Sequence, residues 1–247
     1  MITMHASLIC QVRDGFTGRP LEGSALLCTL DDAAVRPLAK PGGYLILLDL
    51  PSGSHRMTLR CRGYQEEWVE FAVDEGTREL VVTMKPGEGY PFRGPVTRLS
   101  LTVTEGGVPA VGKRLWLAVP APWELKVAQT RAERGQLQLR LYCKGPQSAV
   151  SSGAYLLADG ENSEVVELQE LMEEMGTLAA PLLRSHGRGC PLMLAQCYRT
   201  GTDGQISAVW QDARILAVYD QERQSLTELN LEPGENRRTV VCSVVKP

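Results

Sequence analysis

The residues best suited to metal chemistry are three histidines and two of the cysteines. His5, His55 and His186 lie far apart, and none belongs to an HxH or HxxxH pair. A zinc site needs three or four ligands within tetrahedral reach, and His186 with Cys190 and Cys197 could supply three of them. Because the glycines around His186 are equally typical of an ordinary turn, the sequence predicts no metal site.

Nucleophilic catalysis would need a serine or cysteine on a strained turn beside a positioned base. The GxSxG pattern does not occur, and the adjacency of Ser185 and His186 has no catalytic meaning. The glycine-rich segments lack a P-loop lysine and a Rossmann context, so no nucleotide or other cofactor is indicated. We therefore expect no catalytic residues and no enzyme. A hydrolase hidden in residues 120–200 is the weakest alternative.

Charged side chains form two further kinds of candidate site. They are the acidic pairs Asp31-Asp32 and Glu66-Glu67, and the arginines Arg184, Arg188 and Arg199. The acidic pairs could bind calcium, but such sites draw oxygens from several converging loops, so solvated carboxylates are the preferred interpretation. The arginines could meet an anion or an acidic partner, although in an acidic protein they more often form an ordinary solvated or interface patch.

The composition is that of a globular protein. The chain has 247 residues, 43% of them hydrophobic and 22% charged, with a net charge of −3. This balance gives no electrostatic reason to expect a nucleic acid or an anionic membrane as partner, and no stretch is long enough to span a membrane. The first residues lack a signal peptide, so we expect synthesis in the cytoplasm, with release by lysis on a particle as one route out.

Seven cysteines is an odd number, and no CxxC pair occurs. Several of the cysteines fall in apolar alternating runs, where a thiol behaves as a small hydrophobe. Cys190 and Cys197 are the one pair that could form a bridge. Reduced core cysteines in a protein made in the cytoplasm are the simpler expectation.

These candidate residues sit in a framework of short strands. Alternating or apolar runs at residues 6–13, 25–30, 44–50, 55–61, 67–73 and 79–84 are separated by turns containing glycine or proline. Turn signals about every ten residues without a helical period predict an all-β sandwich.

The turns also carry a family resemblance over residues 5–86. They read Thr17-Gly18-x-Pro20-Leu21-x-Gly23, then Gly43-Tyr44, then Asp49-Leu50-Pro51-x-Gly53, then Gly63-Tyr64. In this order they resemble the carboxypeptidase regulatory-like (prealbumin-like) β-sandwich domains. The resemblance implies a structural or binding module without catalysis, and it carries no functional residues over to this chain.

Residues 87–96 are rich in proline and glycine and predict a linker between domains 1–86 and 97–247. We expect Tyr90 and Phe92 to pack on one domain and fix the interdomain angle, with an exposed aromatic patch as the alternative. The second half repeats the earlier turns: Gly107 to Gly112 has the spacing of Gly18 to Gly23. Residues 231–234 resemble the turn at residues 50–53, and we expect a final strand after them at 238–245.

This repetition predicts a second, divergent copy of the Ig-like or prealbumin-like sandwich, split by an insertion at about 120–200. Two separate small β units are the alternative. Within the insertion we expect strands at residues 136–142, 153–158, 163–168 and 192–198, and one short helix at residues 167–175. Residues 180–191 resemble, weakly, turns of β-rich phage-tail and baseplate proteins.

Two functions follow as hypotheses. The first is a non-catalytic adaptor that joins protein subunits of a larger assembly, for which a contractile phage tail or phage-like injection particle is the most compatible setting. The second is a ligand-binding module, for carbohydrate or protein, which exposed tryptophans would favour. Trp116 and Trp123 are close in sequence, yet Trp116 alternates as a core residue. The oligomeric state stays open.

Overall fold

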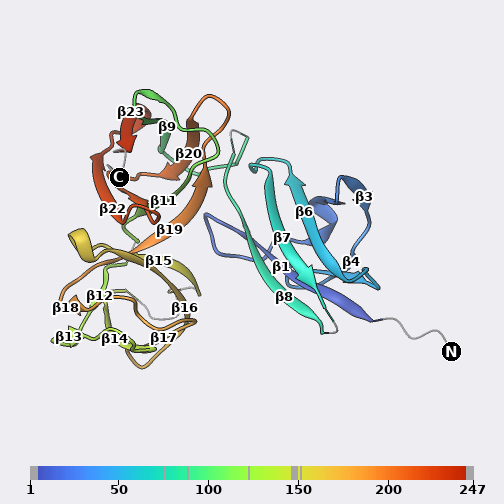
Figure 1. Ribbon diagram of the computed structural model, residues 1–247, viewed down its shortest axis with the longest axis horizontal. Helices are drawn as coiled ribbons and strands as arrows, with labels where there is room; N and C mark the ends of the chain where they lie inside the picture. The colour runs from blue at the N-terminus through green and yellow to red at the C-terminus, as the bar shows by residue number, and fades with distance from the viewer. Residues whose placement is uncertain are drawn as a thin grey trace. The chain divides into compact units, whose positions relative to one another are not determined.

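The computed structural model describes residues 5–74, 76–87, 89–121, 123–145, 150 and 152–242. The chain divides into two compact units, Met1–Arg93 and Gly94–Pro247. The described residues form β-strands and short 3-10 turns without an α-helix (Figure 1). The all-β class expected from the turn spacing is therefore confirmed. None of the described segments forms a helix with the length and apolar character needed to cross a membrane.

The first unit is a sandwich of two four-stranded sheets. Its strands are β1 (Ala6–Asp14), β2 (Leu26–Leu30), β3 (Ala33–Val35), β4 (Leu38–Lys40), β5 (Tyr44–Leu48), β6 (Gly53–Cys61), β7 (Glu67–Val73) and β8 (Arg78–Met84). One sheet has the order β4-β5-β1-β8 and the other β3-β2-β6-β7. The alternating side chains face one core between the sheets, where Leu8, Met57 and Met84 are fully buried.

The sandwich part of the second unit has seven strands. They are β9 (Val96–Glu105), β10 (Val108–Pro109), β11 (Arg114–Val119), β20 (Gln205–Gln211), β21 (Ile215–Asp220), β22 (Ser225–Asn230) and β23 (Gly234–Cys242). Strand β9 pairs with β10, β20 and β23, while β11, β21 and β22 lie in the facing sheet. A core that includes Leu101, Leu115 and Leu216 fills the space between the sheets.

The pairing scheme of the first unit recurs in the second. The first strand pairs in parallel with the last in both cases, β1 with β8 and β9 with β23. It also pairs antiparallel with β5 in one unit and with β20 in the other. In the facing sheets, β2-β6-β7 corresponds to β11-β21-β22. The two sandwiches therefore share one strand framework.

The correspondence extends to one glycine in each unit. The Val12 N–H donates to the Gly43 carbonyl at 2.8 Å, and the Val103 N–H donates to the Gly204 carbonyl at 2.9 Å. Both glycines have positive φ, and a Cβ at either would lie within 2.8 Å of the carbonyl oxygen of Val12 or Val103. A side chain cannot fit where the backbone approaches so closely, which explains glycine at both positions.

The second unit is enlarged between β11 and β20, where the first unit has only β3 and β4. The added strands are β12 (Leu125–Val127), β13 (Arg131–Ala132), β14 (Gln138–Cys143), β15 (Gly153–Leu157), β16 (Glu164–Met172), β17 (Met175–Leu178), β18 (His186–Gly187) and β19 (Leu192–Arg199). Figure 1 shows most of them gathered at one end of this unit.

Six of the added strands close into a small antiparallel barrel in the order β12-β14-β17-β16-β15-β19. The Lys126–Pro191 bridge and the Val127 N–H bond to the Cys190 carbonyl join the first strand to the last. The barrel has its own core, in which Leu139, Leu141 and Tyr155 are fully buried. Strand β19 continues from the barrel and pairs with β11 in the sandwich.

The helix expected at residues 167–175 does not form, and that prediction was wrong. Strand β16 continues to Met172, turns at Glu173 and Glu174, and returns as β17. Both turn residues have positive φ, as a two-residue hairpin requires. Pairing along this hairpin satisfies the backbone groups of the segment and buries Leu168 in the barrel, which outweighs its helical propensity.

The aromatic residues of the linker pack on the first unit. Phe16 lies edge-to-face against Tyr90 and Phe92, and Tyr64 makes the same kind of contact with Tyr90. The Tyr64 and Tyr90 hydroxyls both donate to Asp14 Oδ2, at 3.1 and 2.7 Å. Burial, with the Asp14 carboxyl next in order, raises the pKa of both phenols. These contacts anchor the start of the linker.

One predicted repeat does not hold in the structure. Residues 231–234 lie between β22 and β23, whereas residues 50–53 lie between β5 and β6. The two turns share a positive-φ glycine, Gly53 and Gly234, but occupy different places in the framework. Their similarity reflects a common need for a tight turn. Part of the strand expected at 238–245 lies outside the described residues, and β23 ends at Cys242.

Candidate functional site

The densest group of functional side chains lies at one end of the barrel. His186 comes from β18, and Glu164 begins β16. Asp159 lies just beyond β15, while Cys190 lies just before β19. The His186 side chain is 0% exposed, so its polar contacts are formed without competition from water. Four segments therefore bring one imidazole, two carboxyls and one thiol together.

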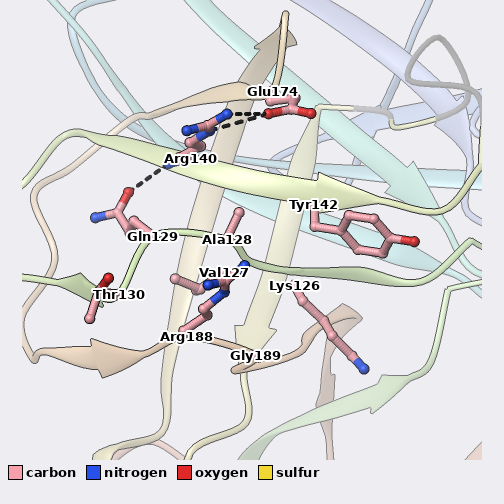
Figure 2. A pocket seen from close by; sticks show the side chains of 10 residues that line it. All are labelled: Lys126, Val127, Ala128, Gln129, Thr130, Arg140, Tyr142, Glu174, Arg188 and Gly189. Carbon is pink, nitrogen blue, oxygen red and sulfur yellow. Dashed lines mark hydrogen bonds and ion pairs between the residues drawn. The ribbon is translucent and has the colours of Figure 1, made fainter.

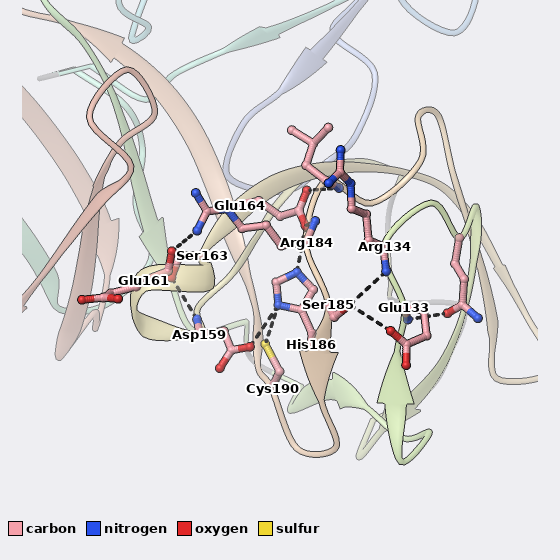
Figure 3. Close-up of polar contacts among 12 residues, drawn as sticks. Glu133, Arg134, Asp159, Glu161, Ser163, Glu164, Arg184, Ser185, His186 and Cys190 are labelled. Atoms are coloured by element: carbon pink, nitrogen blue, oxygen red, sulfur yellow. Dashed lines mark hydrogen bonds and ion pairs between the residues drawn. The ribbon is translucent and has the colours of Figure 1, made fainter.

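The two ring nitrogens of His186 face different partners (Figure 3). Nε2 lies 2.9 Å from Glu164 Oε1, and Nδ1 lies 3.2 Å from Asp159 Oδ2. Glu164 also accepts the backbone N–H groups of Leu183 and Arg184, at 2.9 and 2.8 Å. A tautomer protonated at Nε2 can donate to Glu164 and leaves Nδ1 facing Asp159. The contacts on both sides hold the ring in one orientation.

Cys190 completes the group on the Nδ1 side of the ring. Its Sγ lies 4.0 Å from His186 Nδ1, on the same side as Asp159. Donor atoms of Asp159, His186 and Cys190 all lie within 4.8 Å of one another, the one such metal-ligand group among the described residues. Burial, followed by the nearby Asp159 and Glu164 carboxylates, raises the pKa of the Cys190 thiol to about 12. The thiol is therefore protonated at neutral pH unless a cation displaces the proton.

The combination of His186, Cys190 and Cys197 considered from the sequence is only partly assembled. Cys197 pairs with Trp116 near the far end of β19, seven residues beyond Cys190. Strand geometry separates the two cysteines by roughly 20 Å, far beyond disulfide reach. All seven cysteines lie in the described part of the chain and are free thiols. The third member of the group is Asp159, which sequence reasoning missed.

The acidic pairs do not converge on a calcium site. Asp31 contacts His55, with 2.6 Å between Oδ2 and Nδ1, while Glu66 bonds to Arg60 and Glu67 bonds to Lys85. These carboxyls are thus paired with cationic partners or with an imidazole. Asp31 and Glu66 are exposed, as expected of solvated carboxylates. Glu67 is only 17% exposed and its pKa is raised by burial, so for Glu67 the expectation of a solvated carboxylate was wrong.

The three arginines do not form one patch. Arg184 bonds to the Glu161 carbonyl and to Gln224, and Arg188 lines a groove. Arg199 lies opposite Arg114, at the far end of β19.

The groove that contains Arg188 is open and has a volume of about 680 Å³. Figure 2 shows its lining residues, which come mainly from β12, β14 and the turns beside them. Arg140 is paired with Glu174, whereas Arg188 makes no side-chain hydrogen bond or ion pair within the described part of the chain. The half-exposed ring of Tyr142 lies in the same groove. An aromatic face with a free cation suits a polar or anionic ligand.

Comparison with known proteins gives no family for this chain. No protein-family model and no curated protein sequence matches it. The carboxypeptidase regulatory-like resemblance therefore remains a similarity of turn motifs, while the β-sandwich that it implies is present.

Among solved structures, the chain is similar to a streptococcal ancillary pilin at 11% identity and a TM-score of 0.26, covering 98% of this chain and 62% of that one. It is similar to BcpA, the major pilin subunit of Bacillus cereus, at 9% identity and a TM-score of 0.28, covering 98% and 99%. The shaft pilin SpaA of Lactobacillus rhamnosus GG matches at 8% identity and a TM-score of 0.26, covering 99% and 100%. The chain spans less than two thirds of the ancillary pilin. Similarity at this level assigns no function.

Proposed function

We propose that this protein is a non-catalytic structural adaptor that joins protein subunits of a larger assembly. The observation that carries the proposal is the repeated sandwich framework, in which the last strand of each copy is an edge strand. Strand β8 lies at the end of its sheet, and β23 pairs only with β9 among the described strands. Two copies of one framework offer two similar attachment edges on one chain.

Each of these edges carries an outward-facing valine. Val81 on β8 is 59% exposed, and Val241 on β23 is 67% exposed. An edge strand presents unpaired N–H and carbonyl groups, and an added strand from a partner can pair with them. The exposed valines would then pack against alternate side chains of that partner.

The assembly that we propose is a phage-tail-like particle, into which the protein is incorporated after synthesis in the cytoplasm. Its support is the resemblance of residues 180–191 to turns of baseplate proteins. In the structure this segment carries His186 into the barrel and bonds to Glu164. Genes for sheath, tube or baseplate proteins beside the gene of this protein would support the setting, and their absence would count against it.

The adaptor proposal is tested in the cells that make the protein, by sedimentation and cross-linking mass spectrometry. We expect the wild-type chain to sediment with a large complex and to cross-link near β8 or β23. Val81→Lys and Val241→Lys place a charge on an edge without touching the core and should release the chain from the complex. Leu27→Lys is the matched control, because Leu27 is 72% exposed on β2, which is not an edge strand. A wild-type chain that sediments alone would refute the proposal.

The second candidate function is ligand binding, and the groove with Tyr142 and Arg188 is the observation that favours it. A carbohydrate could stack on the exposed ring while an acidic substituent meets the guanidinium. A glycan array, followed by Tyr142→Ala and Arg188→Ala variants, tests this function. An array without binding removes it.

A further inference from the structure

We propose that Asp159, His186 and Cys190 bind one divalent zinc ion at the end of the barrel. The proposal is independent of the adaptor function. It rests on the convergence of three different metal-ligand types and on the position of the imidazole between them and Glu164. Zinc is the metal of choice because thiolate and imidazole are the ligands it prefers, with a carboxylate as a common third.

The distances between the donor atoms are close to those that zinc requires. With Zn–N and Zn–O bonds of about 2.1 Å and a Zn–S bond of about 2.3 Å, tetrahedral ligands lie roughly 3.4 to 3.6 Å apart. In the structure His186 Nδ1 lies 3.2 Å from Asp159 Oδ2 and 4.0 Å from Cys190 Sγ. All three donor atoms lie within 4.8 Å of one another, so side-chain movements of up to about 1 Å would bring them to one ion. The fourth position would be filled by water.

The imidazole is already oriented for this role by Glu164. Nε2 lies 2.9 Å from Glu164 Oε1, and Nδ1 faces Asp159 and Cys190. Zinc-binding histidines commonly donate their other N–H to a carboxylate in this way. Glu164 is itself held by the backbone N–H groups of Leu183 and Arg184. The ring would therefore need no rotation to bind a metal.

The charges of the three ligands suit a divalent cation. One zinc ion balances the Asp159 carboxylate and the Cys190 thiolate, so with neutral His186 the three ligands and the metal carry no net charge. The Asp159 side chain is 35% exposed, which gives the ion a route from solvent.

The proposed ion would tie together three segments at the end of the barrel. Asp159 belongs to the β15–β16 connection, His186 to β18, and Cys190 to the turn that leads into β19. A metal that binds only the folded arrangement stabilises it by mass action. We therefore expect zinc to raise the thermal stability of the second unit.

Cobalt(II) titration of the reduced, metal-free full chain tests the proposal, because cobalt replaces zinc in such sites and absorbs light when bound to thiolate. We expect one equivalent of cobalt to produce a sulfur-to-cobalt charge-transfer band, which zinc then abolishes. The band should be lost in Cys190→Ala and retained in the matched control Cys197→Ala. Glu164→Gln, which removes the charge behind His186, should weaken binding by about 10- to 100-fold.

Asp159→Asn guards against a variant that loses metal only because it is unfolded, since this side chain is the most exposed of the three ligands. It should keep the wild-type circular dichroism spectrum and lose most of the affinity for zinc. The proposal is overturned if the wild-type chain binds no stoichiometric cobalt. It is also overturned if Cys190→Ala, folded by circular dichroism, gives the same band as wild type.

Discussion

Replacing Gly43 by alanine should destabilise the first unit far more than the same change at its neighbour Gly42. Both glycines have positive φ, so alanine at either position loses about 1 kcal/mol to left-handed strain. At Gly42 the new Cβ meets only the Tyr44 ring edge, at 3.4 Å. At Gly43 it would lie 2.6 Å from the Val12 carbonyl oxygen and 3.0 Å from that of Leu21.

Relief of that contact requires β1 and the turn after it to move, with loss of the Val12–Gly43 hydrogen bond. Overpacking of this kind costs about 1 to 3 kcal/mol, and the lost hydrogen bond adds about 1 kcal/mol. Gly43→Ala should therefore lose about 2 kcal/mol or more beyond Gly42→Ala, which corresponds to a fall of roughly 8 to 16 °C in Tm for a unit of this size.

Differential scanning calorimetry and urea unfolding of the full chain measure this difference. Trp68 provides a fluorescence probe within the first unit. The transition of the second unit, where it is resolved, should keep its midpoint in both variants. Equal losses for Gly42→Ala and Gly43→Ala would refute the reasoning, because left-handed strain alone would then explain both.

Three other predictions follow from individual contacts. Tyr90→Phe removes one of the two hydroxyls that donate to the buried Asp14 carboxyl. It should lower the free energy of unfolding by about 1.5 kcal/mol, measured by urea unfolding. The pKa of His55 is raised from its ordinary 6.5 by hydrogen bonds to the Pro51 carbonyl and to Asp31. The protonated imidazole therefore contributes its full share to the free energy of unfolding below pH 6.5, and this share is lost as the pH rises through the pKa of His55 in the folded protein. Thermal unfolding measured at several pH values across this range should show a smaller fall in Tm for Asp31→Asn than for the wild-type chain. Glu173→Asn combined with Glu174→Gly supplies the residues that a two-residue hairpin prefers and should raise stability by about 1 kcal/mol, whereas a helix at this place would be weakened.

The sandwich could be predicted from the sequence because its information is local. Alternating residues and turn glycines mark each strand and its ends, and the Gly18-to-Gly23 spacing recurs at Gly107 to Gly112 where the same turn recurs. Strand β22 was missed because it is largely exposed on both faces and shows no apolar alternation. The false helix arose because Leu168, Leu171 and Met172 fit a helical face as well as a hairpin.

The buried cluster could be predicted only in part, because its members come from separate segments. The sequence shows that His186 and Cys190 are only four residues apart. It does not show that Cys190 lies beside His186 while Cys197 pairs with Trp116 on β11. Asp159 lies 27 residues before His186 and reaches it only through the barrel pairing. No local pattern marks such an aspartate. Its place depends on strand order, which a single sequence does not reveal.

The parallel pairing of first and last strands has a mechanical consequence. Tension applied along the chain would pull β1 and β8 past each other lengthwise, and would do the same to β9 and β23. The load is then shared by all seven registered pairs of the first ladder and all nine of the second, instead of opening them one at a time. A chain built in this way resists extension, and its longer second ladder would be the last to yield.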